Sequence, residues 1–211
     1  MSKYHPLSTQ LSFIKRTVGL GLAFAALTWL GGCAHPIVIT PQLQMLETKS
    51  GPISTKNAGY FIAKSDREKQ VITPGGGGDK VSYYPYKELE PALYKALTGV
   101  FNRVYTLESL DNKDYIAKQN IKFIFVPQIE TASSSTGILT WPPTDFIVSI
   151  DCSAMDESGK ILWKTKVNES GHAEYQEFLG DFALSAKRAS EKAFKVFQDA
   201  LVNAPEFLHG K

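Results

Sequence analysis

The chain has 211 residues, of which 23 are Lys or Arg and 21 are Asp or Glu, so its formal charge is +2. Three of the basic residues (Lys3, Lys15 and Arg16) and none of the acidic residues precede position 33, so the rest of the chain is almost neutral. A near-neutral body argues against nucleic acid as a partner, and the length suits one domain.

Residues 17–32 form an uncharged, mostly apolar run that follows Lys15 and Arg16 and ends in Gly31 and Gly32. A basic start, a short apolar centre and small residues at the exit are typical of a secretory signal peptide. The run has roughly 16 residues, whereas a helix that spans a membrane needs ~20. It is therefore too short to be expected as a transmembrane helix.

The run ends in Leu30-Gly31-Gly32-Cys33, which resembles the lipobox of bacterial lipoproteins: Leu, a small residue, Gly or Ala, then Cys. The resemblance implies that residues 1–32 are removed by cleavage between Gly32 and Cys33. It also implies palmitate or similar acyl chains on Cys33, which would anchor the chain stably in a membrane. Ala34 stands where an Asp would imply retention at the inner membrane. We therefore expect a lipid anchor in the outer membrane, on its periplasmic side.

Residues 33–57 contain Pro36, Pro41 and Pro52 and show no sustained hydrophobic period. This composition predicts a flexible, lipidated tether with a reach of roughly 25–30 Å. Alternatively, the apolar residues 37–39 dock as an edge strand.

The first half of the following domain predicts strands over 59–64 and 70–73 and then a helix that begins near Pro85 or Pro91. Between them, the glycine run 75–78 precedes Asp79 and Lys80, which does not match the spacing of a phosphate-binding loop, so we expect a mobile turn. The apolar face of the helix recurs at three- and four-residue steps: Leu89, Leu93, Ala96, Leu97, Val100 and Phe101.

The second half predicts a strand at 103–107, a short helix at 111–119 capped by Asp111, and a central strand at 121–126 that Pro127 ends or bulges. Further strands are expected at 146–154 and 161–167, joined by a hairpin turn at 156–159. Cys152 falls on the apolar face of its strand, so we expect a buried and unreactive thiol.

A long helix is expected from about Asp181 to Pro205, with one apolar stripe. Its stripe comprises Phe182, Ala186, Ala189, Ala193, Val196, Phe197, Ala200 and Leu201. This order of elements predicts one α+β domain over 58–208. We expect a two-layer sandwich of a mixed β-sheet with a long C-terminal helix and one or two further helices. The layout resembles the periplasmic domains of small envelope lipoproteins of the YajG, CsgG-like and TolB-N-terminal-like groups, a resemblance that implies no shared active site.

Candidates for chemistry are few. His172 lies after the predicted hairpin and could form a hydrolase site with Asp151, although a surface histidine is the simpler interpretation. No His or Cys pair has metal-ligand spacing, so we expect neither a metal nor a cofactor. Glu88 and Glu90 point away from each other on a helix and make a poor acid–base pair.

Two aromatic groups are candidate partner contacts. Tyr83, Tyr84 and Tyr86 could form a contact patch, or they could pack under the first helix. In the polar loop 131–144, Leu139 and Trp141 could project as an anchor for another envelope protein or for the membrane interface. Otherwise, Trp141 folds back onto the sheet.

These observations favour a non-enzymatic accessory or adaptor lipoprotein in outer-membrane or cell-envelope assembly, with another envelope protein as partner. A periplasmic hydrolase with a site near His172 is the alternative. A secretion-pore subunit ranks lower, because a membrane hairpin needs about 18–22 residues of alternating character and residues 130–145 are too few and too polar.

Overall fold

The computed structural model describes residues 34–46, 51–137 and 140–208. Its larger sheet has the strand order β5-β2-β6-β7-β8. Strands β5 (Phe101–Leu107), β2 (Ser54–Phe61) and β6 (Ile121–Ser134) are parallel, whereas β6, β7 (Asp145–Met155) and β8 (Ile161–His172) are antiparallel. The sheet is therefore mixed, as predicted.

A smaller sheet has the order β1-β4-β3. Strand β1 (His35–Pro36) pairs in parallel with β4 (Lys80–Tyr83), which pairs antiparallel with β3 (Val71–Pro74). Strand β4 was not among the strands predicted from the sequence.

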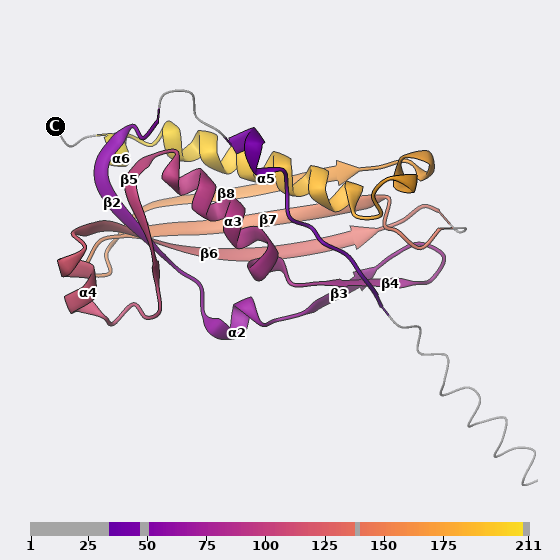
Figure 1. Cartoon of the computed structure of the whole chain (residues 1–211), viewed down its shortest axis with the longest axis horizontal. Coiled ribbons are helices and arrows are strands. Elements are labelled where there is room, and N and C mark those ends of the chain that lie inside the picture. The colour runs from indigo at the N-terminus through magenta and orange to yellow at the C-terminus, as the bar shows by residue number, and fades with distance from the viewer. Residues whose placement is uncertain (1–33, 47–50, 138–139, 209–211) are drawn as a thin grey trace, which may run out of the picture. The chain divides into compact units, whose positions relative to one another are not determined.

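Helices α3 (Pro85–Thr98) and α5 (Leu184–Val202) lie along one face of the larger sheet (Figure 1). Pro85 occupies the first turn of α3, where its missing N–H would have had no partner. The predicted α3 residues Leu89, Leu93, Ala96 and Leu97 are buried, as are the alternate residues Phe146 to Ala154 of β7. The α+β class with a long C-terminal helix is thus confirmed.

Short helical segments complete the chain: η1 (Leu43–Leu46), α2 (Lys64–Arg67), α4 (Lys113–Lys118), η2 (Tyr175–Leu179) and α6 (Pro205–Leu208). The last of these closes the core. The ring of Phe207 lies 5.0–5.5 Å from the rings of Phe101, Phe123, Phe125 and Trp163. Aromatic packing thus joins α6 to β5, β6 and β8 of the larger sheet.

A polar cluster joins α2, α3 and β2. Arg67 donates from Nε and Nη2 to the two carboxylate oxygens of Glu90, each at 2.8 Å, and the Tyr60 hydroxyl donates to Glu90 at 2.8 Å. Burial alone would raise the pKa of Glu90, but these hydrogen bonds outweigh it and lower the pKa. Glu90 therefore has a structural role.

Several local predictions were wrong. Pro127 does not end its ladder: β6 continues to Ser134, with Pro127 opposite Cys152. Pairing with β2 ends at Phe125, so the proline nitrogen can face a side of β6 that has no ladder partner. Asn112, not Asp111, caps α4, because its Oδ1 accepts from the Tyr115 backbone N–H at 3.1 Å.

The predicted stripe of α5 also needs correction at two positions. Phe182 and Val196 are 51% and 42% exposed, whereas Phe194 is fully buried. Phe182 precedes the helix, and the small residues Ser185, Ala186, Ala189 and Ser190 let α5 lie close to the sheet. The contact face is therefore rotated from the predicted one.

Candidate functional site

The residues that directly follow Cys33 belong to the folded domain. The compact unit begins at Ala34, and β1 pairs His35 with Val81. Ile37 and Ile39 are buried, and the Ile39 N–H donates to Glu88 Oε2 at 2.7 Å. The predicted tether is therefore wrong for residues 34–46, where docking, the alternative, is correct. It is also wrong for residues 54–57, which belong to β2. Residues 1–33, including the predicted cleavage site at Gly32 and Cys33, lie outside the described residues.

The docked segment is held at both of its ends. Beyond Ile39, the Thr40 hydroxyl donates to the Glu88 carbonyl at 3.0 Å. Leu46 is buried, and the Gln198 side chain donates to its carbonyl at 3.0 Å. Helices α3 and α5 thus hold this segment through side chains that stand far away in the sequence.

Trp141 folds back beside this docked segment. Its ring stacks on His35 at a centroid distance of 4.4 Å and an interplanar angle of 23°. The Phe182 ring lies 5.0 Å away on the α5 side. Trp141 is half-buried and packs against the core, so the alternative, in which it folds back onto the sheet, is correct. Its role as a contact stays a prediction. Leu139, its predicted companion, lies outside the described residues.

The glycine run packs against the same loop. The Gly76 N–H donates to the Trp141 carbonyl at 2.9 Å, and the Gly77 N–H donates to the Gly137 carbonyl at 3.1 Å. A Cβ on Gly76 would overlap the carbonyl oxygen of Thr140. Close backbone approach therefore requires a residue without a side chain there. The run is a turn, as predicted. Its N–H groups donate hydrogen bonds to backbone carbonyls of the loop that contains Trp141.

The three tyrosines do not form a surface patch. Tyr83 is 1% exposed, and its hydroxyl donates to Thr131 Oγ1 at 2.8 Å. The Tyr86 hydroxyl accepts from the Ile129 N–H at 3.0 Å, and burial raises the pKa of both phenols. Tyr84 alone stands at the surface, with Lys87 Nζ 5.7 Å from its ring centroid. Strand β4 and the start of α3 place Tyr83 and Tyr86 against β6, so both pack, as the alternative predicted, although against the sheet and not under the helix.

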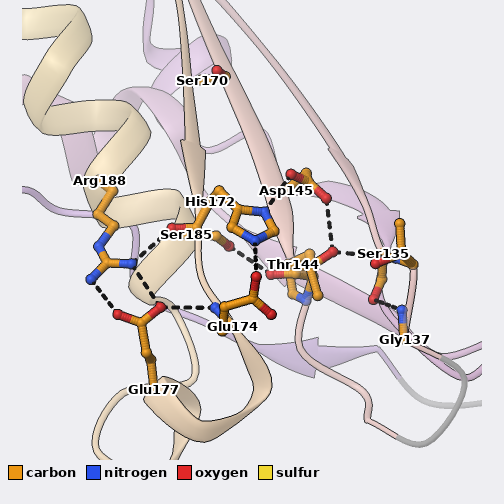
Figure 2. A network of polar contacts seen from close by, with 12 residues as sticks. Ser135, Gly137, Thr144, Asp145, Ser170, His172, Glu174, Glu177, Ser185 and Arg188 are labelled. Atoms are coloured by element: carbon orange, nitrogen blue, oxygen red, sulfur yellow. Dashed lines mark hydrogen bonds and ion pairs between the residues drawn. The ribbon is translucent and has the colours of Figure 1, made fainter.

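His172 is the centre of a polar network at the paired ends of β7 and β8 (Figure 2). Its Nδ1 lies 2.7 Å from Asp145 Oδ1, and its Nε2 lies 3.0 Å from Glu174 Oε1. Hydrogen bonds to Asp145 and then to Glu174 raise the pKa of His172 above its usual value. In its charged form, the ring donates from both nitrogens, one to each carboxylate.

An ion pair extends this network onto α5. Arg188 donates to both carboxylate oxygens of Glu177, at 2.7 and 3.1 Å, and to the His172 carbonyl at 2.9 Å. The hydrogen bonds from Arg188 and from the Glu174 backbone lower the pKa of Glu177 to about 2. The geometry joins β7, β8, η2 and α5, which favours a structural role.

The predicted pairing of His172 with Asp151 was wrong, because Asp151 lies opposite Lys166 in the ladder. Asp145, which the sequence analysis overlooked, lies opposite His172. Continuing the pairing from the predicted turn would not have found this pair, because the register shifts between Ala154 and Met155. The two carboxylates lie at different nitrogens, on opposite sides of the ring. They therefore cannot bind one metal ion together with the ring. Within the described ranges, no group of three or more His, Cys, Asp or Glu residues is placed to hold a metal.

Cys152 is fully buried, as predicted, and burial raises the pKa of its thiol. A thiol that is kept protonated and away from solvent is unreactive. Across the described residues, the structure contains no helix with the length and apolar character required to cross a membrane.

No protein-family model matches the chain, and no curated protein is similar to it. Among solved structures, a DUF330-family protein from Xanthomonas campestris is similar at a TM-score of 0.47 and 11% identity, over 80% of this chain and 90% of that one. A "putative lipoprotein" from Caulobacter crescentus is similar at a TM-score of 0.34 and 12% identity, over 75% and 90%. The PelC dodecamer from Paraburkholderia phytofirmans is similar at a TM-score of 0.37 and 15% identity, over 67% of this chain and 89% of that one. At such identities, we base no functional argument on these likenesses.

Proposed function

We propose that this protein is a lipid-anchored envelope lipoprotein on the periplasmic side of the outer membrane, with a non-enzymatic accessory or adaptor role in envelope assembly. The observation that carries the proposal is Leu30-Gly31-Gly32-Cys33 followed directly by a compact unit that begins at Ala34. A signal peptide ending in an acylatable cysteine, next to a folded body, is what such an anchor requires.

The His172 network supports a structural rather than a catalytic role for its residues. A histidine that acts as a general base needs an unprotonated nitrogen within reach of the proton that it removes. Here Asp145 and Glu174 both stabilise the charged ring, in which neither nitrogen has a free lone pair. The hydrolase alternative therefore has no specific observation in its favour.

Metabolic labelling with palmitate tests the anchor, because the chain offers a matched control in its only other cysteine. The wild type and Cys152→Ala should incorporate label, and Cys33→Ser should not. Label on the Cys33→Ser protein, or none on the wild type, would refute acylation at Cys33.

Membrane fractionation tests the destination. The wild type should separate with the outer membrane, whereas Ala34→Asp should move to the inner membrane if the lipobox resemblance extends to sorting. An unchanged distribution of the variant would refute sorting by residue 34.

The adaptor role predicts that cross-linking in intact cells joins the protein to another envelope protein. The Cys33→Ser protein, expressed at the same level, is the control, because it should lose partners that require membrane attachment. Recovery of the wild-type chain without any partner would contradict an adaptor role.

A further inference from the structure

We infer that the end of the domain that bears His35, Trp141 and Phe182 lies against the lipid headgroups of the anchoring membrane. The recognised partner is thus a lipid surface, and the domain has a fixed orientation on it. This inference rests on the proposed acylation of Cys33, and it adds which surface of the domain meets the bilayer.

Chain length sets the distance between the anchor and this surface. Two extended residues span at most about 7 Å, so the Cα of Cys33 lies within that distance of the Cα of His35. The headgroup layer is about 5–8 Å deep on each side of a bilayer, given about 30 Å of hydrocarbon in a total of about 40–45 Å. A cysteine whose acyl chains enter the hydrocarbon therefore holds His35 at or near the headgroups.

The docked segment leaves little freedom to turn away from the membrane. His35 and Pro36 are in register with Val81 and Ser82 in the small sheet, and the Ile37 N–H donates to the Ser82 carbonyl at 3.0 Å. Ile39 is then fixed by Glu88. An anchor attached directly to a paired strand orients a domain, whereas an anchor on a tether would not.

The side chains beside His35 suit the interface. Trp141 stacks on His35, and its ring has both an apolar body and an N–H, a combination that is enriched at membrane–water interfaces. Phe182, next to Trp141, is 51% exposed although it is large and apolar. Figure 1 shows the β3–β4 turn and the segment before α5 at the same end of the domain, and β1 pairs with β4.

Apolar side chains are also exposed on and beside the small sheet. Pro36, Ser82 and Ile72 are in register across β1, β4 and β3, and Ile72 is 57% exposed. Val38, which follows β1, is 58% exposed between the buried Ile37 and Ile39. Exposed apolar side chains beside an acylated cysteine are covered most simply by the bilayer that the acyl chains enter.

Among the described residues at this end, charged side chains of both signs lie close together. Asp79 lies 3.6 Å from His35, and Lys187 is paired with Asp181 at 2.7 Å. The contact should therefore depend on the anchor and on aromatic burial rather than on attraction to anionic lipids, which salt would screen.

Fluorescence quenching by brominated lipid tests the inference, because cleavage before Cys33 removes Trp29 and leaves only Trp141 and Trp163. The acylated protein is reconstituted into phosphatidylethanolamine/phosphatidylglycerol vesicles that contain lipid brominated near the headgroup end of the acyl chain. Trp163→Phe leaves Trp141 as the reporter. Trp141→Phe leaves Trp163, which is also partly buried but lies opposite Ala154 at the other end of β7, as the matched control. A second reporter, Phe182→Trp in a chain with both tryptophans replaced by Phe, changes an exposed position and should fold.

We expect strong quenching of Trp141 and of a tryptophan at position 182, weak quenching of Trp163, and no change at high salt. Absence of quenching at positions 141 and 182, in protein that floats with the vesicles, would overturn the inference but leave the anchor intact. Equal quenching of all three would also overturn it, because the domain would have no fixed orientation. Protein that carries no acyl chain and does not float would refute the proposed anchor itself, a separate result.

Discussion

At Gly171 the backbone of α5 lies directly against the sheet, and replacing this glycine by Ala tests that contact. A Cβ there would overlap the Ser185 carbonyl oxygen and the Ala189 backbone nitrogen, and would lie 3.0 Å from the Arg188 carbonyl carbon. All three are backbone atoms of one helix, so no side chain can rotate away. The helix would have to move from β8, which would also disturb the bond from Arg188 to the His172 carbonyl.

Overpacking of this kind typically costs about 1–3 kcal/mol, and an obstruction by backbone places Gly171→Ala at the upper end. The lower entropy of the unfolded Ala chain offsets about 0.4–1 kcal/mol, which leaves a net loss of about 2–3 kcal/mol. For a body of this size, that corresponds to a fall in melting temperature of roughly 5–10 °C.

Thermal and urea unfolding of the mature protein, followed by circular dichroism, measure this loss. Gly180→Ala is the matched control, because a Cβ there meets nothing within 4 Å and its φ of −102° is ordinary for Ala. The control should stay within about 0.5 kcal/mol of the wild type. If Gly171→Ala behaves like Gly180→Ala, then α5 does not contact β8 at this point and the packing described here is wrong.

Four further changes have defined outcomes. Cys152→Ala should lower the free energy of unfolding by about 1 kcal/mol, and the native thiol should react slowly with a thiol reagent; rapid labelling would contradict its burial. Glu90→Gln should cost about 1–3 kcal/mol at neutral pH. Because the folded pKa of Glu90 is lowered, this stability is present above its usual value of 4.5 and is lost as the pH falls; a cost that persists in acid would argue against the ion pair. His172→Gln should destabilise most below pH 6.5, and the difference from wild type should vanish as the pH rises through the raised pKa of His172; a difference that grows with pH would contradict the network. Trp141→Ala should lower the melting temperature through a loss of about 2 kcal/mol, roughly half the cost for a fully buried Trp, whereas an unchanged melting temperature would show that the ring is not packed.

Elements defined by local patterns could be predicted from the sequence. The alternation from Phe146 to Ala154 identified β7 and the burial of Cys152, because successive side chains of a strand point to opposite faces. The three- and four-residue spacing around Leu89 and Leu93 identified α3 in the same way. These signals lie within one element and need no knowledge of distant residues.

The errors concern contacts between distant parts of the chain. Residues 34–46 have the composition of a tether, and strand β4 and the side chains of Glu88 and Gln198 hold them on the domain. Trp141 lies in a polar loop, and its burial depends on His35, 106 positions earlier in the sequence. Asp145 meets His172 only once the register of a long hairpin is known. Local composition does not encode these contacts, because they form only when the topology brings distant segments together.

The anchor at Cys33 is the central claim, and mass spectrometry of the mature protein's N-terminal peptide tests it most directly. The proposal predicts that protein purified from cell membranes begins at Cys33 and that this peptide carries the added mass of acyl chains. A peptide that begins upstream of Cys33, or one that begins there with an unmodified thiol and amino group, would contradict it.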